Sequence, residues 1–127
     1  MATGFLLCES NMTIHVHEIN MENFEEVVDT HPLVLLDFWA TWCAPCKMLS
    51  PLLEQLASHH TDIFFGKVNT EIATDLAEAF QVRSVPTLIG FKNGELVLEL
   101  AGLLPPDKYE QILDQLRSAE APTPVEE

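Results

Sequence analysis

A run of seven residues, Leu33–Trp39, constrains the fold more than any other segment of this chain. It is apolar at every position except Asp37, and a continuous apolar run of this length is typical of a strand buried on both faces. Two cysteines, Cys43 and Cys46, follow within a few residues. The sequence therefore predicts a buried strand that ends just before a cysteine pair.

A helix is predicted to begin at this pair, because apolar residues recur behind it at helical spacing. These residues are Met48, Leu49, Leu52, Leu53, Leu56 and Ala57. Cysteines three residues apart in a first helical turn can close a small disulfide ring. Cys43 would lie at the positive end of the helix dipole, beside unpaired N–H groups, where a reactive thiolate is stabilised. Pro51 falls inside this helix and is expected to kink it.

The remaining elements follow from periodicity and turn signals. Asn20 is a plausible N-cap, and Asn93-Gly94 is the strongest hairpin signal in the chain. Strands are predicted at 13–19, 33–39, 63–69, 87–92 and 95–101, and the other helices at 21–28, 72–80 and from the prolines 105–106 to 118. The inward faces of the last two helices are expected to hold Ile72, Leu76, Ala79 and Phe80, and Tyr109, Ile112, Leu113 and Leu116.

This order of elements predicts an α/β fold with one mixed sheet and helices on both faces. Helix-linked strands favour parallel pairing, and the closing hairpin adds an antiparallel edge. We expect a single domain over residues 13–119, an N-terminal extension over 1–12 and a disordered acidic tail over 120–127. Met12, directly before the first strand pattern, is a candidate alternative start.

The charge balance excludes several function classes. With 20 acidic and 6 basic residues the formal charge is −14, so the chain lacks the basic face that a nucleic-acid binder needs, and anionic membranes are poor partners. Basic-faced proteins suit it better. One close cysteine pair in a chain with three cysteines indicates redox or metal chemistry in a reducing compartment, and we expect a cytoplasmic monomer.

Asp37 is a candidate functional residue in its own right. It is the only charged residue in an otherwise apolar strand, so burial should raise the pKa of its carboxyl group.

Taken together, these features resemble the thioredoxin family over nearly the whole domain, from about residue 14 to 116. The resemblance is carried by Asp37-Phe38-Trp39-Ala40, Trp42-Cys43-Ala44-Pro45-Cys46-Lys47, Pro51, Lys67, Val85-Pro86-Thr87, Phe91-Lys92-Asn93-Gly94 and Gly102. A bare CxxC motif is a weak signal, but this combination at this spacing is very specific.

The resemblance implies a protein-disulfide reductase of the thioredoxin fold, an electron donor that maintains cell redox balance. Cys43 would be the exposed nucleophile, and the more buried Cys46 would resolve the mixed disulfide and form the Cys43–Cys46 disulfide. Asp37 would accept the proton of Cys46, with Lys67 modulating it. No cofactor need bind, because family members are recharged by a flavoprotein thioredoxin reductase that uses NADPH.

The resemblance also implies an apolar surface for docking disulfide-containing protein substrates. Its residues would be Trp42, Ala44, Pro45, Val85, Pro86, Ala101 and Gly102, extended by Leu103. Pro86 matches the position of the family's cis-proline. Ala44 departs from the family's usual glycine, and its helix propensity and added methyl group could shift the redox potential.

Other interpretations remain open at this point. The fold could be a binding or chaperone module whose cysteines only regulate it, or an oxidase or isomerase, although such relatives often carry histidine between the cysteines. The cysteines could form half of a zinc site, but only Cys8 and scattered histidines remain as ligands. Asp37 could be a structural acid paired with Lys67. His15 and His17 share a strand face, which we interpret as ordinary surface.

Overall fold

The computed structural model describes residues 15–119. The predicted N-terminal extension with Cys8, the candidate start at Met12 and the predicted acidic tail lie outside these residues. The described elements are β1 (Val16–Glu18), α2 (Met21–Thr30), β2 (Leu33–Trp39), α3 (Ala44–His59), β3 (Phe64–Asn69), α4 (Thr74–Ala79), β4 (Thr87–Lys92), β5 (Glu95–Ala101) and α5 (Lys108–Ser118).

The five strands form one mixed sheet in the order β1-β3-β2-β4-β5. Strands β1 and β2 both pair with β3 in parallel, whereas β4 pairs antiparallel with β2 and with β5. The prediction of a mixed sheet is confirmed. The expectation that helix-linked strands run parallel is wrong for β4, because the chain after α4 enters the sheet on the far side of β2 and runs in the opposite direction.

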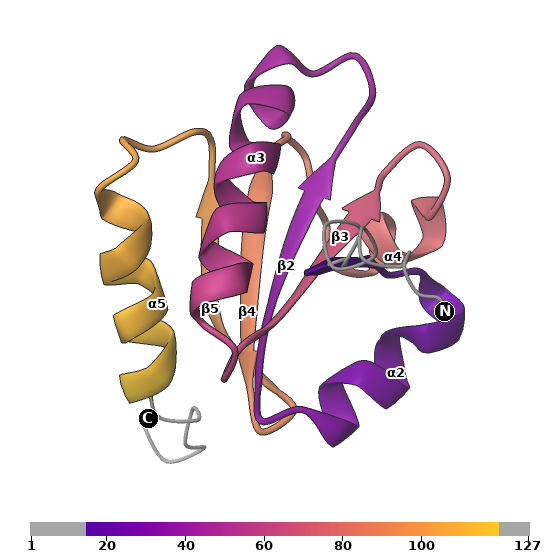
Figure 1. The fold of residues 1–127 in the computed structure, drawn as a ribbon. Coiled ribbons are helices and arrows are strands. Elements are labelled where there is room, and N and C mark those ends of the chain that lie inside the picture. The colour runs from indigo at the N-terminus through magenta and orange to yellow at the C-terminus, as the bar shows by residue number, and fades with distance from the viewer. Residues whose placement is uncertain (1–14, 120–127) are drawn as a thin grey trace, which may run out of the picture.

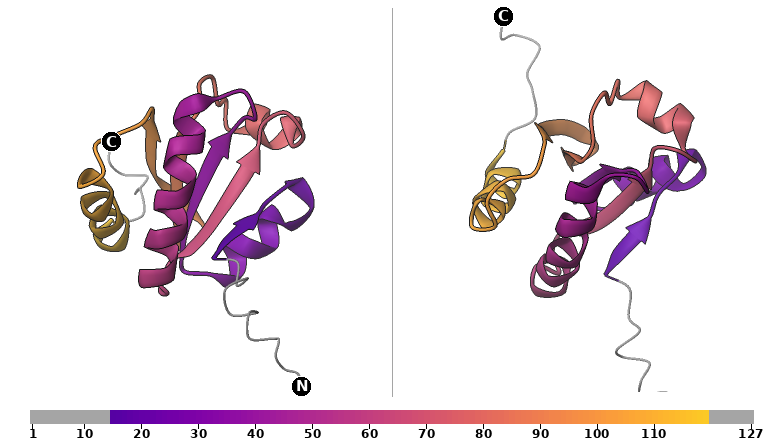
Figure 2. Two further views of the ribbon diagram at one scale, coloured as in Figure 1. Left: turned by 45° about the horizontal axis from the view of Figure 1, so that its top comes forward. Right: turned by 90° about the horizontal axis from the view of Figure 1, so that it is seen from above.

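Helices cover both faces of the sheet, as the order of elements predicts. Helices α3 and α5 pack on one face and α2 and α4 on the other, which is visible when the molecule is seen from above (Figure 2). Strand β2 lies in the middle of the sheet, and its five central residues are buried. Each face therefore has its own apolar core, and β2 contributes side chains to both.

Three residues expected on inward helix faces are exposed. Met48 is 67% exposed because it lies off the buried stripe of α3, which is formed by Cys46, Leu49, Leu53, Leu56 and Ala57. Ile72 is 75% exposed because it precedes α4, which begins at Thr74. The same late start turns Ala79 outward and buries Ala77 instead.

The local signals were more accurate. The Asn20 side chain caps α2 by accepting hydrogen bonds from Glu22 N and Asn23 N. Asn93 and Gly94 both have positive φ, 53° and 84°, as the predicted two-residue hairpin requires.

The first strand is shorter than predicted, since β1 begins at Val16. Helix α3 continues through Pro51. No helix within residues 15–119 is both long and apolar enough to cross a membrane.

Candidate active site

The cysteine pair lies at the junction between β2 and α3, at the end of the sheet where β2 and β3 finish (Figure 1). Cys43 is the N-cap of α3, and its Sγ accepts a hydrogen bond of 3.1 Å from Cys46 N. Cys43 and Cys46 form a disulfide. Cys43 thus occupies the helix N-terminus predicted from the sequence, where unpaired N–H groups and the dipole favour a thiolate.

The prediction that Cys43 is exposed and Cys46 more buried is wrong for this disulfide form. Cys43 is 2% exposed and Cys46 3%. Both sulfur-bearing side chains pack in a small apolar cluster with Ala40, against which Trp39 and Val85 also lie.

Asp37 lies beneath the disulfide and is 4% exposed. Burial raises the pKa of its carboxyl group from the ordinary 3.8 to about 7, and the positive charge of Lys67 partly opposes this rise. The two residues are directly opposite each other in the β2–β3 register. No ion pair closer than 4.0 Å joins them in the described part of the chain, and Asp37 Oδ1 accepts no hydrogen bond there.

A cavity of about 120 Å³ lies between the acid and the second cysteine. It is lined by Asp37, Trp39, Cys46, Lys47, Ser50 and Lys67. The carboxyl group with the raised pKa and the second cysteine therefore share one cavity with two lysines.

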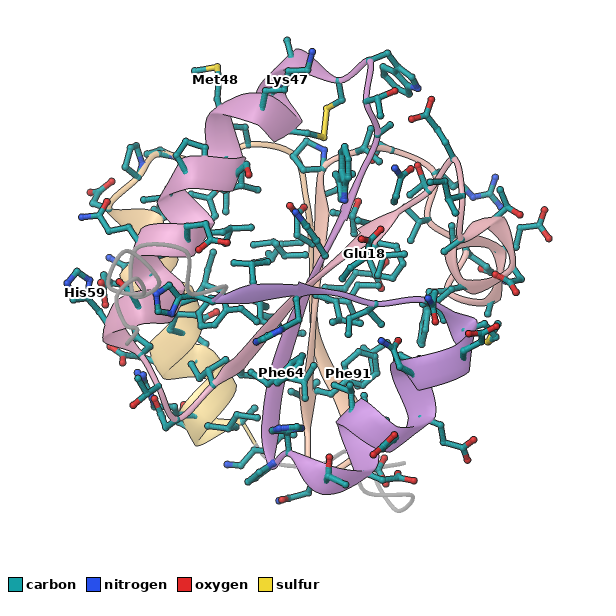
Figure 3. All side chains as sticks on the ribbon, turned by 45° about the vertical axis from the view of Figure 1, so that its right-hand side comes forward. Glu18, Lys47, Met48, His59, Phe64 and Phe91 are labelled. Carbon is teal, nitrogen blue, oxygen red and sulfur yellow. A yellow bond between two sulfur atoms is a disulfide. The ribbon has the colours of Figure 1, made fainter. Side chains whose placement is uncertain are left out.

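The predicted docking residues gather around the disulfide. Trp42 is 72% exposed, and Ala44, Pro45, Ala101, Gly102 and Leu103 are also exposed, while Val85 is half-buried and Pro86 is buried. The Val85–Pro86 peptide bond is cis. Gly102 N donates to Pro86 O at 2.8 Å, which ties the end of β5 to the proline loop. Lys47 and Met48 lie at the same end as the disulfide, whereas Phe64 and Phe91 lie toward the opposite end (Figure 3).

Sequence reasoning missed one residue beside the site. Glu71 Oε1 accepts two hydrogen bonds from Thr41, one from its backbone N–H at 2.8 Å and one from its hydroxyl at 2.7 Å. These bonds lower the pKa of Glu71. They join the loop before Cys43 to the loop after β3. The two residues are thirty positions apart, so only the pairing of β2 with β3 could have indicated the contact.

His15 and His17, at the start of β1, belong to no metal-binding group in the described residues. Among residues 15–119, no group of three or more histidine, cysteine or acidic side chains could hold a metal ion. The ring of His17 instead stacks on Phe64, with centroids 5.0 Å apart and planes at 20°.

Comparison with known proteins agrees with this geometry. Residues 15–115 match the thioredoxin family. The chain belongs to the thioredoxin family. It is 42% identical to a thioredoxin of Chlamydia caviae over 100 residues, covering 79% of this chain and 97% of that one. It is 40% identical to a putative thioredoxin 2 of Streptomyces coelicolor over 100 residues, covering 79% of this chain and 75% of that one.

Solved thioredoxin structures share the fold. A point mutant of a thioredoxin from Halobacterium salinarum superposes with a TM-score of 0.75 at 34% identity, covering 82% of this chain and 93% of that one. Family membership and the Cys43–Cys46 disulfide together identify a thiol–disulfide oxidoreductase. Thioredoxins act on disulfide-containing targets and generally bind no cofactor.

Proposed function

We propose that this protein reduces protein disulfides, with Cys43 as nucleophile and Cys46 as resolving thiol. The observation that carries this proposal is the placement of Cys43 Sγ at the N-terminus of α3, accepting the Cys46 N–H. In the reduced protein the same N–H groups and the helix dipole would stabilise a Cys43 thiolate, which is the attacking species.

The reaction would proceed in two exchanges. The Cys43 thiolate attacks one sulfur of the substrate disulfide, that S–S bond breaks, and the departing substrate thiolate takes up a proton. The Cys46 thiol then loses its proton and attacks the Cys43 sulfur, which forms the Cys43–Cys46 bond and releases the second substrate thiolate. The protein gives up two electrons and the proton of Cys46, the substrate gains the two electrons, and solvent supplies the further proton that leaves both substrate sulfurs as thiols.

Asp37 is our proposed acceptor for the Cys46 proton, with Lys67 as the residue that adjusts its pKa. A general base works best when its pKa lies near the working pH, and the Asp37 pKa of about 7 meets this condition. The cavity shared with Cys46 has room for a water molecule that would relay the proton, and its lining includes the polar side chains of Asp37, Ser50 and Lys67.

Substrates would dock on the surface around the disulfide, which comprises exposed Trp42, Ala44, Pro45, Ala101 and Gly102 with half-buried Val85 and buried Pro86. In the described residues no backbone hydrogen bond uses the N–H or carbonyl of Val85, so both are available to an extended substrate segment. One structural neighbour, 27% identical with a TM-score of 0.75, comes from work on how thiols are resolved in a yeast mitochondrial 1-Cys peroxiredoxin through the glutathione and thioredoxin systems.

A flavoprotein thioredoxin reductase using NADPH would recharge the disulfide, and the protein would act as a cytoplasmic monomer. The scarcity of cysteines supports a reducing compartment.

The test is NADPH consumption by the purified protein with a thioredoxin reductase and insulin, comparing wild type with Cys43→Ser. Cys8→Ser is the matched control, because it removes a thiol outside the pair. Turnover should vanish in Cys43→Ser and persist in Cys8→Ser. Replacing the reductase with dithiothreitol separates a mismatched reductase from a lack of activity. If wild type still fails to accelerate insulin reduction, the reductase assignment is overturned in favour of a binding module.

A further inference from the structure

A surface groove of about 130 Å³ borders the disulfide on the side of the proline loop. It is lined by Trp42, Thr70, Val82, Arg83, Ser84 and Val85. Two of these residues connect it to the active site, because Trp42 precedes Cys43 and Val85 packs against the cysteine cluster. A substrate segment that reaches Cys43 over this side must therefore cross the groove.

Arg83 is the one charged residue among the described residues that line this groove. Its side chain is exposed. Within residues 15–119 no carboxylate lies within 4.0 Å of it, whereas Arg117, the chain's other arginine, pairs with Asp62 and Asp114. The acid nearest in sequence to the groove lining, Glu71, accepts both hydrogen bonds of Thr41. The Arg83 guanidinium is thus available to a partner.

The position of this charge is unusual for the molecule as a whole. The chain has 20 acidic and 6 basic residues, yet Lys47, Lys67 and Arg83 all lie near the disulfide, since the first two line the cavity beside Cys46. Three of the chain's six basic residues therefore lie at the active-site end, together with the acids Asp37 and Glu71. Of the three, only Arg83 lines the groove that a substrate would cross.

We infer that Arg83 selects protein substrates that carry an acidic side chain beside the disulfide under attack. The substrate's apolar residues would lie on Trp42 and Val85, and its carboxylate would reach the guanidinium in the same groove. Arginine suits this role because its planar fork binds carboxylates with two parallel hydrogen bonds. This inference rests on the proposed function and specifies its substrate class.

The distance dependence of electrostatics separates this local effect from the charge of the whole molecule. The net charge of −14 repels any acidic partner at long range, but at physiological ionic strength charges more than about 8 Å apart are largely screened. Only the placement of a substrate's charge next to its disulfide should then matter. Two substrates of equal net charge and different charge placement will distinguish the two effects.

The experiment uses two synthetic peptides with the same intramolecular disulfide and the same composition. One carries glutamate beside the disulfide and lysine at its far end, and the other carries them exchanged. Pre-reduced protein is mixed with excess peptide, quenched in acid, and the reduced peptide is quantified by chromatography. Each rate is divided by the rate with dithiothreitol, which corrects for the intrinsic reactivity of each disulfide.

Wild type should reduce the peptide with the nearby glutamate faster, by up to about fivefold, as expected for one solvent-exposed ion pair. Arg83→Gln should bring the ratio close to one, and Arg83→Glu should reverse it. The preference of wild type should shrink in about 0.5 M salt. Lys108→Glu changes the net charge equally, at an exposed position of α5 outside the groove, and should keep the wild-type ratio.

Equal rates for the two peptides with wild type, or an unchanged ratio in Arg83→Glu, would overturn the role of Arg83 while leaving the reductase function intact. A wild type that reduces neither peptide faster than Cys43→Ser does would overturn the reductase function, and this inference with it.

Discussion

Asp37 illustrates at the scale of one residue how burial links function to stability. Its pKa rises from 3.8 to about 7 on folding because its carboxylate is desolvated. Between these pH values the folded state holds a proton that the unfolded state has lost, so the free energy of unfolding falls as the pH rises toward 7. The acid that we propose as the acceptor of the Cys46 proton therefore destabilises the fold at neutral pH.

Asp37→Asn should consequently stabilise the protein. The gain should be near zero below about pH 4, grow as the pH rises to 7 and level off above it, reaching about 4 kcal/mol at most. Denaturant unfolding of the oxidised protein at several pH values measures it. Asp29→Asn, on the exposed surface of α2, should show no such trend. A gain that does not vary with pH would argue against a raised Asp37 pKa.

The sequence correctly predicts that Asp37 is buried. For Cys43 it predicts the position at the helix N-terminus but not the exposure of the side chain. One acid among six apolar neighbours implies burial whatever surrounds the strand. The exposure of Cys43 depends on its packing with Trp39 and Val85, which come together only in the folded chain. Motif position indicates the role of such a residue but not its accessibility.

Among the elements, the loop before Cys43 is held by a contact from another part of the chain. Glu71→Ala removes the acceptor for both Thr41 donors, so hydrogen exchange of the Thr41 amide should accelerate. Exchange monitored by NMR is the measurement. Glu78→Ala, on the exposed side of α4, is the control. Unchanged Thr41 exchange in Glu71→Ala would mean that the contact does not order this loop.

A second prediction concerns the packing of β3 between its neighbours. A methyl group added at Gly66 would lie 2.6 Å from Ile19 Cγ1 and 2.8 Å from Leu36 Cδ2. These buried side chains cannot move without disturbing the core, so Gly66→Ala should cost about 1–3 kcal/mol of unfolding free energy. Chemical denaturation tests this. A loss below about 0.5 kcal/mol would show that the core relaxes around the methyl group.

Element boundaries explain most errors of the sequence-based predictions. Strands and turns with strong local signals, such as β4 and the Asn93-Gly94 turn, were located correctly. Helix α4 is only six residues long, too short for its periodicity to define the start, so Ile72 and Ala79 were assigned to the wrong face. The order of strands depends on long-range pairing, which no local pattern encodes.

At the scale of the whole molecule, repulsion among the negative charges lowers the stability of the fold, and salt should weaken that repulsion. A formal charge of −14 on 127 residues destabilises the compact state through self-repulsion, which counterions screen. The melting temperature should therefore rise between about 10 mM and 0.5 M sodium chloride. An equal osmolality of a neutral sugar is the comparison. A melting temperature that falls with salt would indicate that attractive ion pairs, such as Arg117 with Asp62, dominate instead.

The two ends of the described chain lie away from the disulfide. His15 lines a cavity together with Pro32 and Phe64, where β2 and β3 begin. The carbonyl of Ala119 accepts a hydrogen bond from Lys92 Nζ, at the hairpin end of β4. A fusion partner or a surface tether joined beyond either residue would thus start from the opposite end of the domain. Immobilised through either end, the protein should keep its active-site end accessible to substrates in solution.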